Sequence, residues 1–458
     1  MPRLLLDEVE VDPTTARIYA EGWQSWSPTT WYPPAVVGLR PDLDWQHTMR
    51  FRPGVAVADD SVQAEGLLVV DPGTGAPARV YAAPDAQVGV PTLWATTMGD
   101  RLHVEASHVV AVEEHAEGAE AALAAHADAF ARNAGVTTLR PAPNAWCSWY
   151  RYFEEVTADD VRENLLACAD QGLDIDVVQI DDGWSTGLGE LMRPRQGFEP
   201  VARIAEEIRA SGKEVGIWLA PFLVGADTTL ARQHPDWLTG DAGFNWGQRL
   251  VGLDLTHPGV QDHLRELLTG LREAGVTYLK LDFLYAGAVP SARHRDVTGT
   301  QAYRAGLELI REAAGPATYL LGCGAPILPS VGLLDGMRVS PDTFHAEAQD
   351  GSAGLRGLMP LAARAWQHGR FWMNDPDCLV ARPSYALREQ WAEACSTYGG
   401  ARTVSDRIAD LDDWGLATTR RLLADRAPSG PFPADVVAAG ARVAAAERAH
   451  RQPAGDLG

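Results

Sequence analysis

Aspartates stand directly after several short apolar runs in the second half of the chain. Asp181 and Asp182 follow one run and Asp282 follows another. Asp342 comes three residues after a third. Carboxylates in such positions either bind a divalent metal, or bind a sugar and cleave it with one group as nucleophile or base and the other as proton donor. No histidine ends any of the runs, as metal-dependent barrel hydrolases usually require, so the pattern favours a sugar site without metal or cofactor.

Eight apolar runs alternate with amphipathic segments between residues 139 and 426. Helix signals separate them: Thr157 and Asp160 form a capping-box pattern, and Pro258 stands at the start of an amphipathic stretch. Eight strand–helix repeats over this length predict an α/β fold of the (β/α)8 TIM barrel type, whose active sites lie at the C-terminal ends of the strands. The expected strands are 145–149, 176–180, 215–220, 277–281, 318–321, 337–339, 371–373 and 402–404.

The first 138 residues have a different pattern, with short alternating runs between Pro, Gly and Asp clusters. Such runs, among them 54–57, 66–70 and 102–107, predict a small, mostly antiparallel β domain that precedes the barrel. An Ala-rich stretch predicts a connecting helix, and the last residues show no sustained pattern. We therefore expect an N-terminal β-rich domain over 1–138, the catalytic barrel over 139–426, and a C-terminal tail over 427–458 with room for a short helix over 434–449.

Composition excludes several classes of partner. The formal net charge is −22 and the isoelectric point is near 4.9, so nucleic acid and anionic membrane surfaces are disfavoured. No apolar run approaches the roughly 20 residues of a membrane span, and the acidic N-terminus lacks a secretion signal, which predicts a cytoplasmic protein. The five cysteines include no Cys-x-x-Cys pair, so neither a zinc site nor a disulfide framework is indicated.

The ordered motifs of the second half resemble glycoside hydrolase family 36, the melibiase-type α-galactosidases. The resemblance extends from about residue 144 to residue 412, with a fainter match at 22–27. The matching segments are Asn144-Ala-Trp146, Gln179-Ile-Asp181-Asp182-Gly183-Trp184, Gly216-Ile-Trp218-Leu-Ala-Pro221, His234-Pro-Asp-Trp237, Leu253-Asp-Leu-Thr256, Lys280-Leu-Asp282-Phe283, Arg338-Val-Ser-Pro-Asp342-Thr343 and Asn374-Asp-Pro-Asp377.

The resemblance implies a retaining, exo-acting α-galactosidase that hydrolyses terminal α-galactosides. In that family pattern Asp282 attacks the anomeric carbon and forms a covalent glycosyl-enzyme, and Asp342 is the acid/base. Lys280 stands two residues before Asp282 on the same face of its strand, where its charge is expected to keep the nucleophile ionised. The implied partner is a small oligosaccharide or other α-galactoside, and a homo-oligomer is compatible with the family.

The same resemblance implies the residues that hold the sugar. Asp181 and Asp182 would accept hydrogen bonds from the 4- and 6-hydroxyls, and Arg338 and Cys323 would approach the 2-hydroxyl. Lys280 would also meet substrate hydroxyls. Aromatic faces would come from Trp146, Trp218 and, in the N-terminal domain, Trp26.

Several alternatives remain open at this point. Asp375 and Asp377 fit turn formers or helix caps, and Cys323 fits a buried small residue. The family's Gly-Asp-Trp element reads Gly189-Glu190-Leu191 here, and the C-terminal β domain typical of the family is not evident. The preferred sugar, the aglycone and the oligomeric state are therefore undetermined. Other readings are an α-N-acetylgalactosaminidase, a transglycosylase of the raffinose-synthase kind, or a non-catalytic sugar-binding protein.

Overall fold

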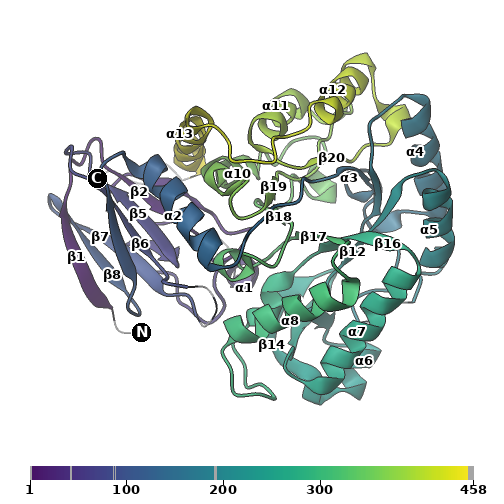
Figure 1. The fold of residues 1–458 in the computed structure, drawn as a ribbon, viewed down its shortest axis with the longest axis horizontal. Helices are drawn as coiled ribbons and strands as arrows, with labels where there is room; N and C mark the ends of the chain where they lie inside the picture. The colour runs from purple at the N-terminus through teal and green to yellow at the C-terminus, as the bar shows by residue number, and fades with distance from the viewer. Residues whose placement is uncertain (1–2, 42–43, 86, 88, 190–192, 452–458) are drawn as a thin grey trace.

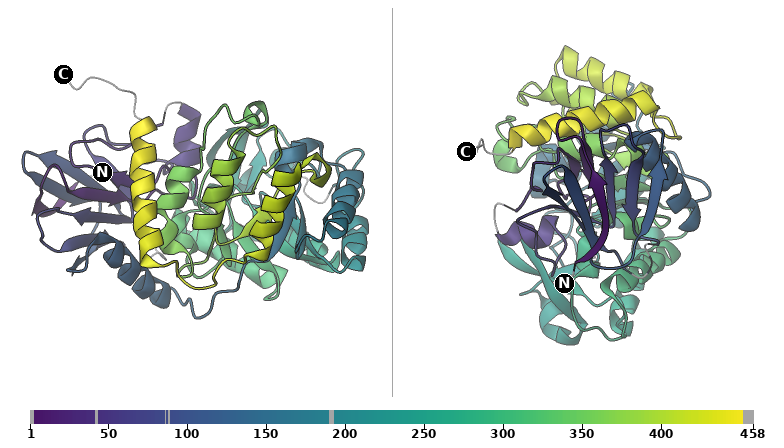
Figure 2. Two further views of the ribbon diagram at one scale, coloured as in Figure 1. Left: turned by 90° about the horizontal axis from the view of Figure 1, so that it is seen from above. Right: turned by 90° about the vertical axis from the view of Figure 1, so that its left-hand side faces the viewer.

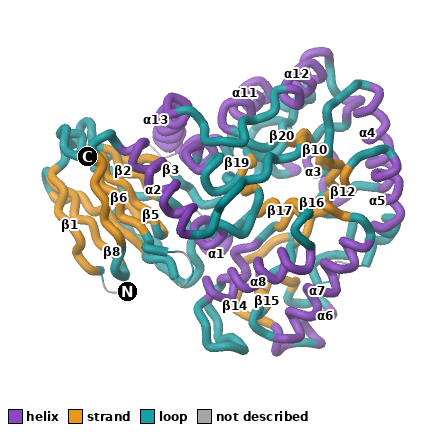
Figure 3. Tube along the Cα trace, viewed as in Figure 1, coloured by secondary structure: helices purple, strands orange, loops and turns teal. Residues whose placement is uncertain are grey.

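Figure 1 shows the fold in a computed structural model, which describes residues 3–41, 44–85, 87, 89–189 and 193–451. A β-rich part at the N-terminus lies against a larger part in which strands alternate with helices. The secondary-structure colouring of Figure 3 separates the two groups of strands clearly. Within the described residues, no helix is long and apolar enough to cross a membrane.

The larger part is a nearly closed barrel of eight strands, every paired neighbour of which is parallel. The predicted (β/α)8 fold is therefore confirmed, and each of the eight expected runs overlaps a strand, although the run 371–373 shares only Met373 with β19. Their residues are almost all buried, as expected where helices cover one face of a parallel sheet and the barrel interior fills the other. In sheet order the strands are β19 (Met373–Asp375), β18 (Gly336–Arg338), β17 (Tyr319–Gly322), β16 (Val276–Leu281), β12 (Glu214–Leu219), β11 (Val177–Ile180), β10 (Asn144–Cys147) and β20 (Arg402–Val404).

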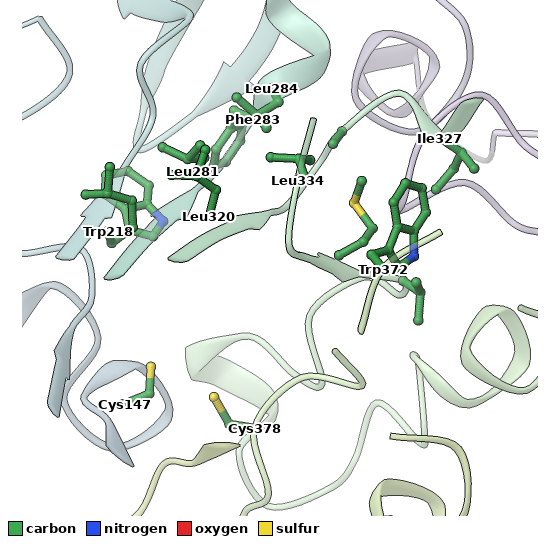
Figure 4. Close-up of a cluster of buried hydrophobic side chains, with 14 of the residues drawn as sticks. Cys147, Trp218, Leu281, Phe283, Leu284, Leu320, Ile327, Leu334, Trp372 and Cys378 are labelled. Atoms are coloured by element: carbon green, nitrogen blue, oxygen red, sulfur yellow. The ribbon is translucent and has the colours of Figure 1, made fainter. Parts of the chain in front are cut away.

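Helices pack around the barrel, and the two whose start the sequence signals predict begin at the expected residues. Thr157 and Asp160 form the expected capping box, and Pro258 opens its helix. The apolar faces of these helices join the barrel strands in one buried cluster, part of which is drawn in Figure 4. The helices are α3 (Trp149–Tyr152), α4 (Ala158–Asp170), α5 (Val201–Ala210), α6 (Thr229–Gln233), α7 (Pro258–Glu273), α8 (Gly299–Ala314), α9 (Ile327–Ser330), α10 (Leu358–Ala363), α11 (Arg388–Tyr398) and α12 (Asp413–Ala424).

A small antiparallel sheet is inserted between β12 and β16. It consists of β13 (Leu223–Gly225), β14 (Leu238–Asn245) and β15 (Gln248–Leu253), in the order β13-β15-β14. The turn between β14 and β15 contains Trp246, which has a left-handed φ of 48°. No sequence pattern predicted this insertion, and its β14–β15 hairpin contributes to the site described below.

The N-terminal part contains two antiparallel sheets, as its alternating runs predict. One has the order β1 (Leu4–Glu10), β8 (Arg101–Ala106), β7 (Thr92–Met98) and β4 (Val62–Glu65). The other has the order β3 (Thr30–Tyr32), β2 (Arg17–Ala20), β5 (Leu67–Asp71), β6 (Ala78–Ala82) and β9 (Ala111–His115). Buried side chains from both sheets form a shared apolar cluster. Two helices, α1 (Asp44–Arg50) and α2 (Ala119–Asn133), complete this part, and α2 is the predicted connector.

One expected strand is absent. The run 54–57 is a turn, because Gly54 adopts a left-handed φ of 77° and packs against Pro290 of the barrel. A Cβ at Gly54 would lie 2.7 Å from Cγ of Pro290, so the close approach needs glycine. The alternation that suggested a strand is explained by contact with the barrel rather than by pairing in a sheet.

The segment after residue 426 is packed rather than loose. It forms α13 (Ala434–Arg451), which is longer than the short helix that the sequence suggested. Figure 2 shows this yellow helix running between the N-terminal sheets and the barrel helices. Thr30 donates a hydrogen bond to the carbonyl of Ala444 (2.9 Å), and the Arg448 guanidinium lies over the Tyr32 ring. On its other side the helix packs against α10, so it contacts both parts of the molecule. The division of the chain into domains at residue 138 stays a prediction.

A buried ion pair also joins the two parts. Arg364, which follows α10, donates two hydrogen bonds to Oε1 of Glu21 beside β2, and both side chains are fully buried. The same guanidinium donates to the carbonyls of Gln24, Ser25 and Val339. It thus connects the loop that contains Trp26 to the strand end that leads to the predicted acid/base.

Candidate active site

A cavity of about 460 Å³ opens at the C-terminal ends of the barrel strands, where the fold type places active sites. Its volume is within the usual range for small-molecule sites. Carboxylates from three strand ends meet in it, together with aromatic side chains. The described lining residues include Trp26, Met49, Arg50, Trp149, Phe153, Glu154, Asp181, Asp182, Trp218, Phe244, Trp246, Lys280, Asp282, Phe283, Asp342, Phe344, His345, Glu347 and Arg356.

Asp282, at the end of β16, is held by two donors. The Nε1 atom of Trp218 on the neighbouring β12 donates to Oδ2 (3.0 Å), and the backbone N–H of Phe283 donates to Oδ1 (2.8 Å). Phe283 has a left-handed φ of 52°, so the chain turns sharply immediately after the carboxylate. Strained backbone of this kind is concentrated at functional sites. The carboxylate is only slightly exposed and has a fixed orientation toward the cavity.

Lys280 pairs with Asp181 rather than with Asp282. Its Nζ is 2.8 Å from Oδ2 of Asp181, which also accepts hydrogen bonds from Gln179 (2.7 Å) and the Cys147 thiol (3.3 Å). Burial raises the pKa of Asp282, and the Lys280 charge opposes this shift without reversing it. The Lys280 charge therefore favours the ionised form of Asp282, as expected. Lys280 also forms an ion pair with Asp181, whose carboxylate is occupied by hydrogen bonds.

Asp182 is the more available of the two neighbouring aspartates. Its Oδ1 accepts the backbone N–H of Gly183 (2.8 Å), and the side chain lines the cavity. Burial raises its pKa to about 7, and the negative charges of Asp181, Glu154 and Asp282 add to the effect. A carboxyl group that titrates near neutral pH can change its hydrogen-bonding role over the physiological range.

Asp342 lies in the loop that follows β18 and is tied to a buried arginine. The Nη2 atom of Arg338 is 2.6 Å from Oδ1 of Asp342, and Nη1 is 3.0 Å from Oδ1 of Asp377. Burial alone would raise the pKa of Asp342, but the charges of Arg338 and Lys280 outweigh it and the pKa is lowered. The Asp342 side chain is about 30% exposed, whereas that of Arg338 is 1% exposed.

Asp377, which the sequence suggested as a turn former, organises this side of the site. Its carboxylate accepts hydrogen bonds from Arg338, from the hydroxyl of Tyr150, and from the N–H and hydroxyl of Thr343 (2.8 and 2.7 Å). It therefore orients the guanidinium that holds Asp342. The sequence signal was its position after a barrel strand, and its left-handed φ of 89° is compatible with the turn-forming role that the sequence also suggested.

Of the three predicted tryptophans, Trp146 is the one that the structure does not place at the cavity. Trp146 does not reach the cavity: it is 1% exposed, and its Nε1 donates to the carbonyl of Asp406 (2.9 Å). Trp149 lines the cavity instead. The reason is the end of β10, which stops at Cys147 rather than at Trp149 as expected, so Trp149 begins the short helix above the strand.

The other predicted residues divide into lining and supporting positions. Trp218 and Trp26 line the cavity, and Trp26 packs edge-on against Phe283 with ring centroids 5.0 Å apart. Arg338 and Cys323 are fully buried and are not among the described lining residues; the Cys323 thiol lies beside the Asp282 carboxyl. The Gly189-Glu190-Leu191 departure falls partly on residues 190–192, which lie outside the described residues.

Sequence reasoning did not find the residues that loops bring to the cavity mouth. Phe244 and Trp246 come from the inserted hairpin, His345 and Arg356 come from the loop after Asp342, and Arg50 comes from the end of α1. None of them follows a barrel strand, and no local pattern distinguishes them from ordinary loop residues. Only the folded arrangement brings them together.

Comparison with known proteins agrees with the fold. Residues 129–309 match the family model described as Melibiase. The structure of TtGalA, an α-galactosidase from Thermus thermophilus in complex with p-nitrophenyl α-D-galactopyranoside, superposes with a TM-score of 0.75 and 28% identity, covering 93% of this chain and 90% of that one.

Two curated relatives match over shorter segments. α-Galactosidase C of Emericella nidulans is 27% identical over 184 residues, which are 35% of this chain and 24% of that protein. α-Galactosidase AgaA of Geobacillus stearothermophilus is 27% identical over 170 residues, 33% of this chain and 23% of that protein. Its structure, described as GH36, has a TM-score of 0.61 at 14% identity, covers 91% of this chain and 61% of that one, and shows the common fold. The matched segments span about a quarter of the length of these curated relatives.

Barrel, site and family model together define a glycoside hydrolase domain. The resemblance to glycoside hydrolase family 36 that the sequence motifs indicate is confirmed as a similarity: residues 129–309 match the Melibiase model, and the relatives and structures compared above are α-galactosidases.

Proposed function

We propose that the protein is a retaining α-galactosidase, with Asp282 as nucleophile and Asp342 as acid/base. The observation that carries the proposal is the pair of carboxylates from β16 and the loop after β18 on one cavity, in a chain that aligns over 93% of its length with an α-galactosidase. Two such carboxyl groups across a sugar site are what glycoside hydrolysis requires. The substrate class is a terminal α-galactoside on a small oligosaccharide, and Asp182, Trp149 and Trp218 contact the sugar.

The assignment of the two roles follows from how each carboxylate is held. Asp282 is fixed by the indole of Trp218 and by the backbone of Phe283, so its oxygens are oriented for in-line attack on an anomeric carbon. Asp342 is on a loop and its main restraint is the Arg338 guanidinium. A group that must first donate a proton and then accept one needs this freedom, whereas a nucleophile needs a fixed position.

The pKa shifts in this structure run opposite to what the first step needs, since the pKa of Asp282 is raised and that of Asp342 is lowered. In the proposed mechanism the bound sugar covers the exposed part of the Asp342 carboxyl, and this desolvation raises its pKa. Asp342 then protonates the leaving oxygen while Asp282 attacks, and in the second step Asp342 removes a proton from the water that releases the sugar.

The test uses p-nitrophenyl α-glycosides of galactose, N-acetylgalactosamine and glucose with the wild type, Asp282→Ala and Asp342→Ala. We expect the wild type to cleave the galactoside and both variants to lose activity. Azide should restore turnover in Asp282→Ala with a β-galactosyl azide product, because azide enters the space of the nucleophile with inversion. In Asp342→Ala it should give α-galactosyl azide. The opposite pairing of variants and anomers would reverse the two roles.

The same covalent intermediate would serve a transglycosylase, and an N-acetyl group at the 2-position would identify an α-N-acetylgalactosaminidase. Release of N-acetylgalactosamine faster than galactose would favour the second activity. Products longer than the substrate when a sugar acceptor is added would favour the first. If the wild type cleaves none of the three glycosides and transfers none to an acceptor, a non-catalytic sugar-binding role replaces the proposal.

A further inference from the structure

The five cysteines of the chain are free and buried, and two of them meet inside the barrel. Cys147 ends β10, and Cys378 comes shortly after β19. Their strands are not direct neighbours, because β20 lies between them: Trp146 and Leu379 both pair with Val404. The thiol of Cys378 interacts with that of Cys147, and Figure 4 shows the two sulfur atoms next to each other. The fold thus forms a pair of thiols from distant parts of the sequence.

The thiol pair lies directly behind the wall of the active-site cavity. The Cys147 thiol donates a hydrogen bond to Oδ2 of Asp181 (3.3 Å), and Asp181 lines the cavity. Nζ of Lys280 is 2.8 Å from the same oxygen. Cys378 directly follows Asp377, whose negative charge acts on its thiol. Carboxylates on both sides of the pair attract a cation and disfavour oxidation of the thiols to anionic sulfinates.

The separation of the two strands decides which chemistry the pair can perform. Two strand spacings separate the backbones by about 9 Å. A disulfide needs Cα atoms within about 7 Å of each other, so it cannot form unless the barrel strands move. A metal ion between the two sulfur atoms supplies the missing length, and soft thiolate ligands select copper(I), which accepts two of them in a nearly linear arrangement. No group of three or more His, Cys, Asp or Glu side chains in the described part of the chain could hold a metal ion, so an ion that requires three or four such ligands does not fit.

We propose that Cys147 and Cys378 form a binding site for one copper(I) ion, and that its occupation inhibits the enzyme. Binding replaces two S–H bonds by two copper–sulfur bonds and releases two protons, with no change of oxidation state. The Cys147 sulfur then no longer donates to Asp181, and the ion fills the space behind that carboxylate. The inhibition rests on the proposed α-galactosidase function, whereas the copper binding does not depend on it.

Copper(I) binding is measured on the reduced protein in the absence of oxygen, in competition with the chelator bathocuproine disulfonate. We expect one copper per wild-type chain and a copper X-ray absorption spectrum with two sulfur neighbours. Cys147→Ser and Cys378→Ser should each lose this copper. Cys168→Ser is the matched control and should keep it, because Cys168 is also free and buried but lies on α4 and does not line the cavity.

Inhibition is measured as the ratio of p-nitrophenyl α-galactoside turnover with copper(I) to turnover without it, within each variant. The ratio should fall at least about tenfold in the wild type and in Cys168→Ser, stay near one in Cys378→Ser, and recover when dithiothreitol removes the copper.

The copper site is refuted if the wild type binds no copper, if the bound copper lacks two sulfur neighbours, or if both thiol variants bind as much copper as the wild type. The absorption spectrum needs only the wild type, so a variant that does not fold leaves this test intact. If copper binds at the two sulfur atoms and the galactoside is cleaved at an unchanged rate, the inhibition is wrong. If copper binds there and the copper-free wild type cleaves no galactoside, the site stands and the proposed function fails.

Discussion

The ion pair between Glu21 and Arg364 provides a quantitative test of how the N-terminal part is joined to the barrel. Both side chains are fully buried, and Arg364 Nε and Nη2 are 2.9 and 2.8 Å from Oε1 of Glu21. Glu21→Gln keeps the shape of the side chain but removes the charge that compensates the guanidinium. Removing one partner of a buried ion pair costs about 3 to 5 kcal/mol, because the other charge stays buried without compensation.

The free energy of unfolding is measured by urea denaturation, with a fall in melting temperature of about 3 to 5 °C as a second readout. The sign of the effect of Glu21→Gln on the free energy of unfolding should depend on whether Arg364 is present. In Arg364→Met, Glu21 is an unpaired buried carboxylate, so adding Glu21→Gln should be neutral or stabilising rather than destabilising. The exposed pair Arg249–Asp241 is the control, with side chains 67% and 50% exposed, and Arg249→Gln should cost about 0.5 kcal/mol or less.

Two results would refute the reasoning. The first is a fall of less than about 1 kcal/mol in the free energy of unfolding for Glu21→Gln. A guanidinium left buried without its counter-charge is destabilising by more than that. The second is an equal loss from Glu21→Gln in the wild type and in Arg364→Met, which would mean that the two side chains do not interact. A raised KM in Glu21→Gln is also expected, since Arg364 donates to the carbonyls of Gln24 and Ser25 next to the cavity residue Trp26.

Three further predictions concern the site. Trp149→Ala should lower kcat/KM at least tenfold with little change in melting temperature. Trp146→Phe should instead lower the melting temperature and leave kcat/KM within about threefold, because it removes packing and a hydrogen bond away from the sugar. The kcat/KM of the wild type should rise with pH through an ionisation near 7, because the ionised Asp182 carboxylate is the stronger acceptor, and a profile in Asp182→Asn that keeps this ionisation would contradict the assignment. Asp377→Asn removes one of the two carboxylates that pair with Arg338, so the whole Arg338 charge acts on Asp342. Turnover of melibiose should then fall at least tenfold more than turnover of α-galactosyl fluoride, because the fluoride leaving group needs less protonation. Equal losses on the two substrates would show that Asp377 does not act through the acid/base.

The barrel could be predicted from the sequence because its signals are local. Most of the strands are short apolar runs, because parallel strands buried on both faces are rich in apolar residues. Some of the helices carry their own start signal, as in the capping box of Thr157 and Asp160. The placement of Asp282 and Asp342 at strand ends followed from the same runs, because the fold type fixes which end of a strand faces the site.

Only the tertiary structure decided which side chains lie next to one another, and therefore which ion pairs and pKa shifts occur. The sequence could not show that Lys280 is paired with Asp181, that Asp377 holds Arg338, or that burial raises the pKa of one catalytic carboxyl while an arginine lowers that of the other. These properties depend on distances between residues from different strands, and the sequence contains no distances.

The same limit explains why the loops and the ends of helices and strands could not be predicted from the sequence. The choice between Trp146 and Trp149 depended on two residues at the end of β10, which is the least determined part of any strand. The inserted hairpin with Phe244, and the packing of α13 between the two parts of the molecule, involve weak local patterns that become stable only through contact. The sequence by itself therefore determined the barrel and the strand ends where its chemistry stands, because those are set by local burial. Long-range packing decided which side chains reach the cavity and which charge they bear, because the burial and the pKa of each group depend on neighbours that are distant in the chain.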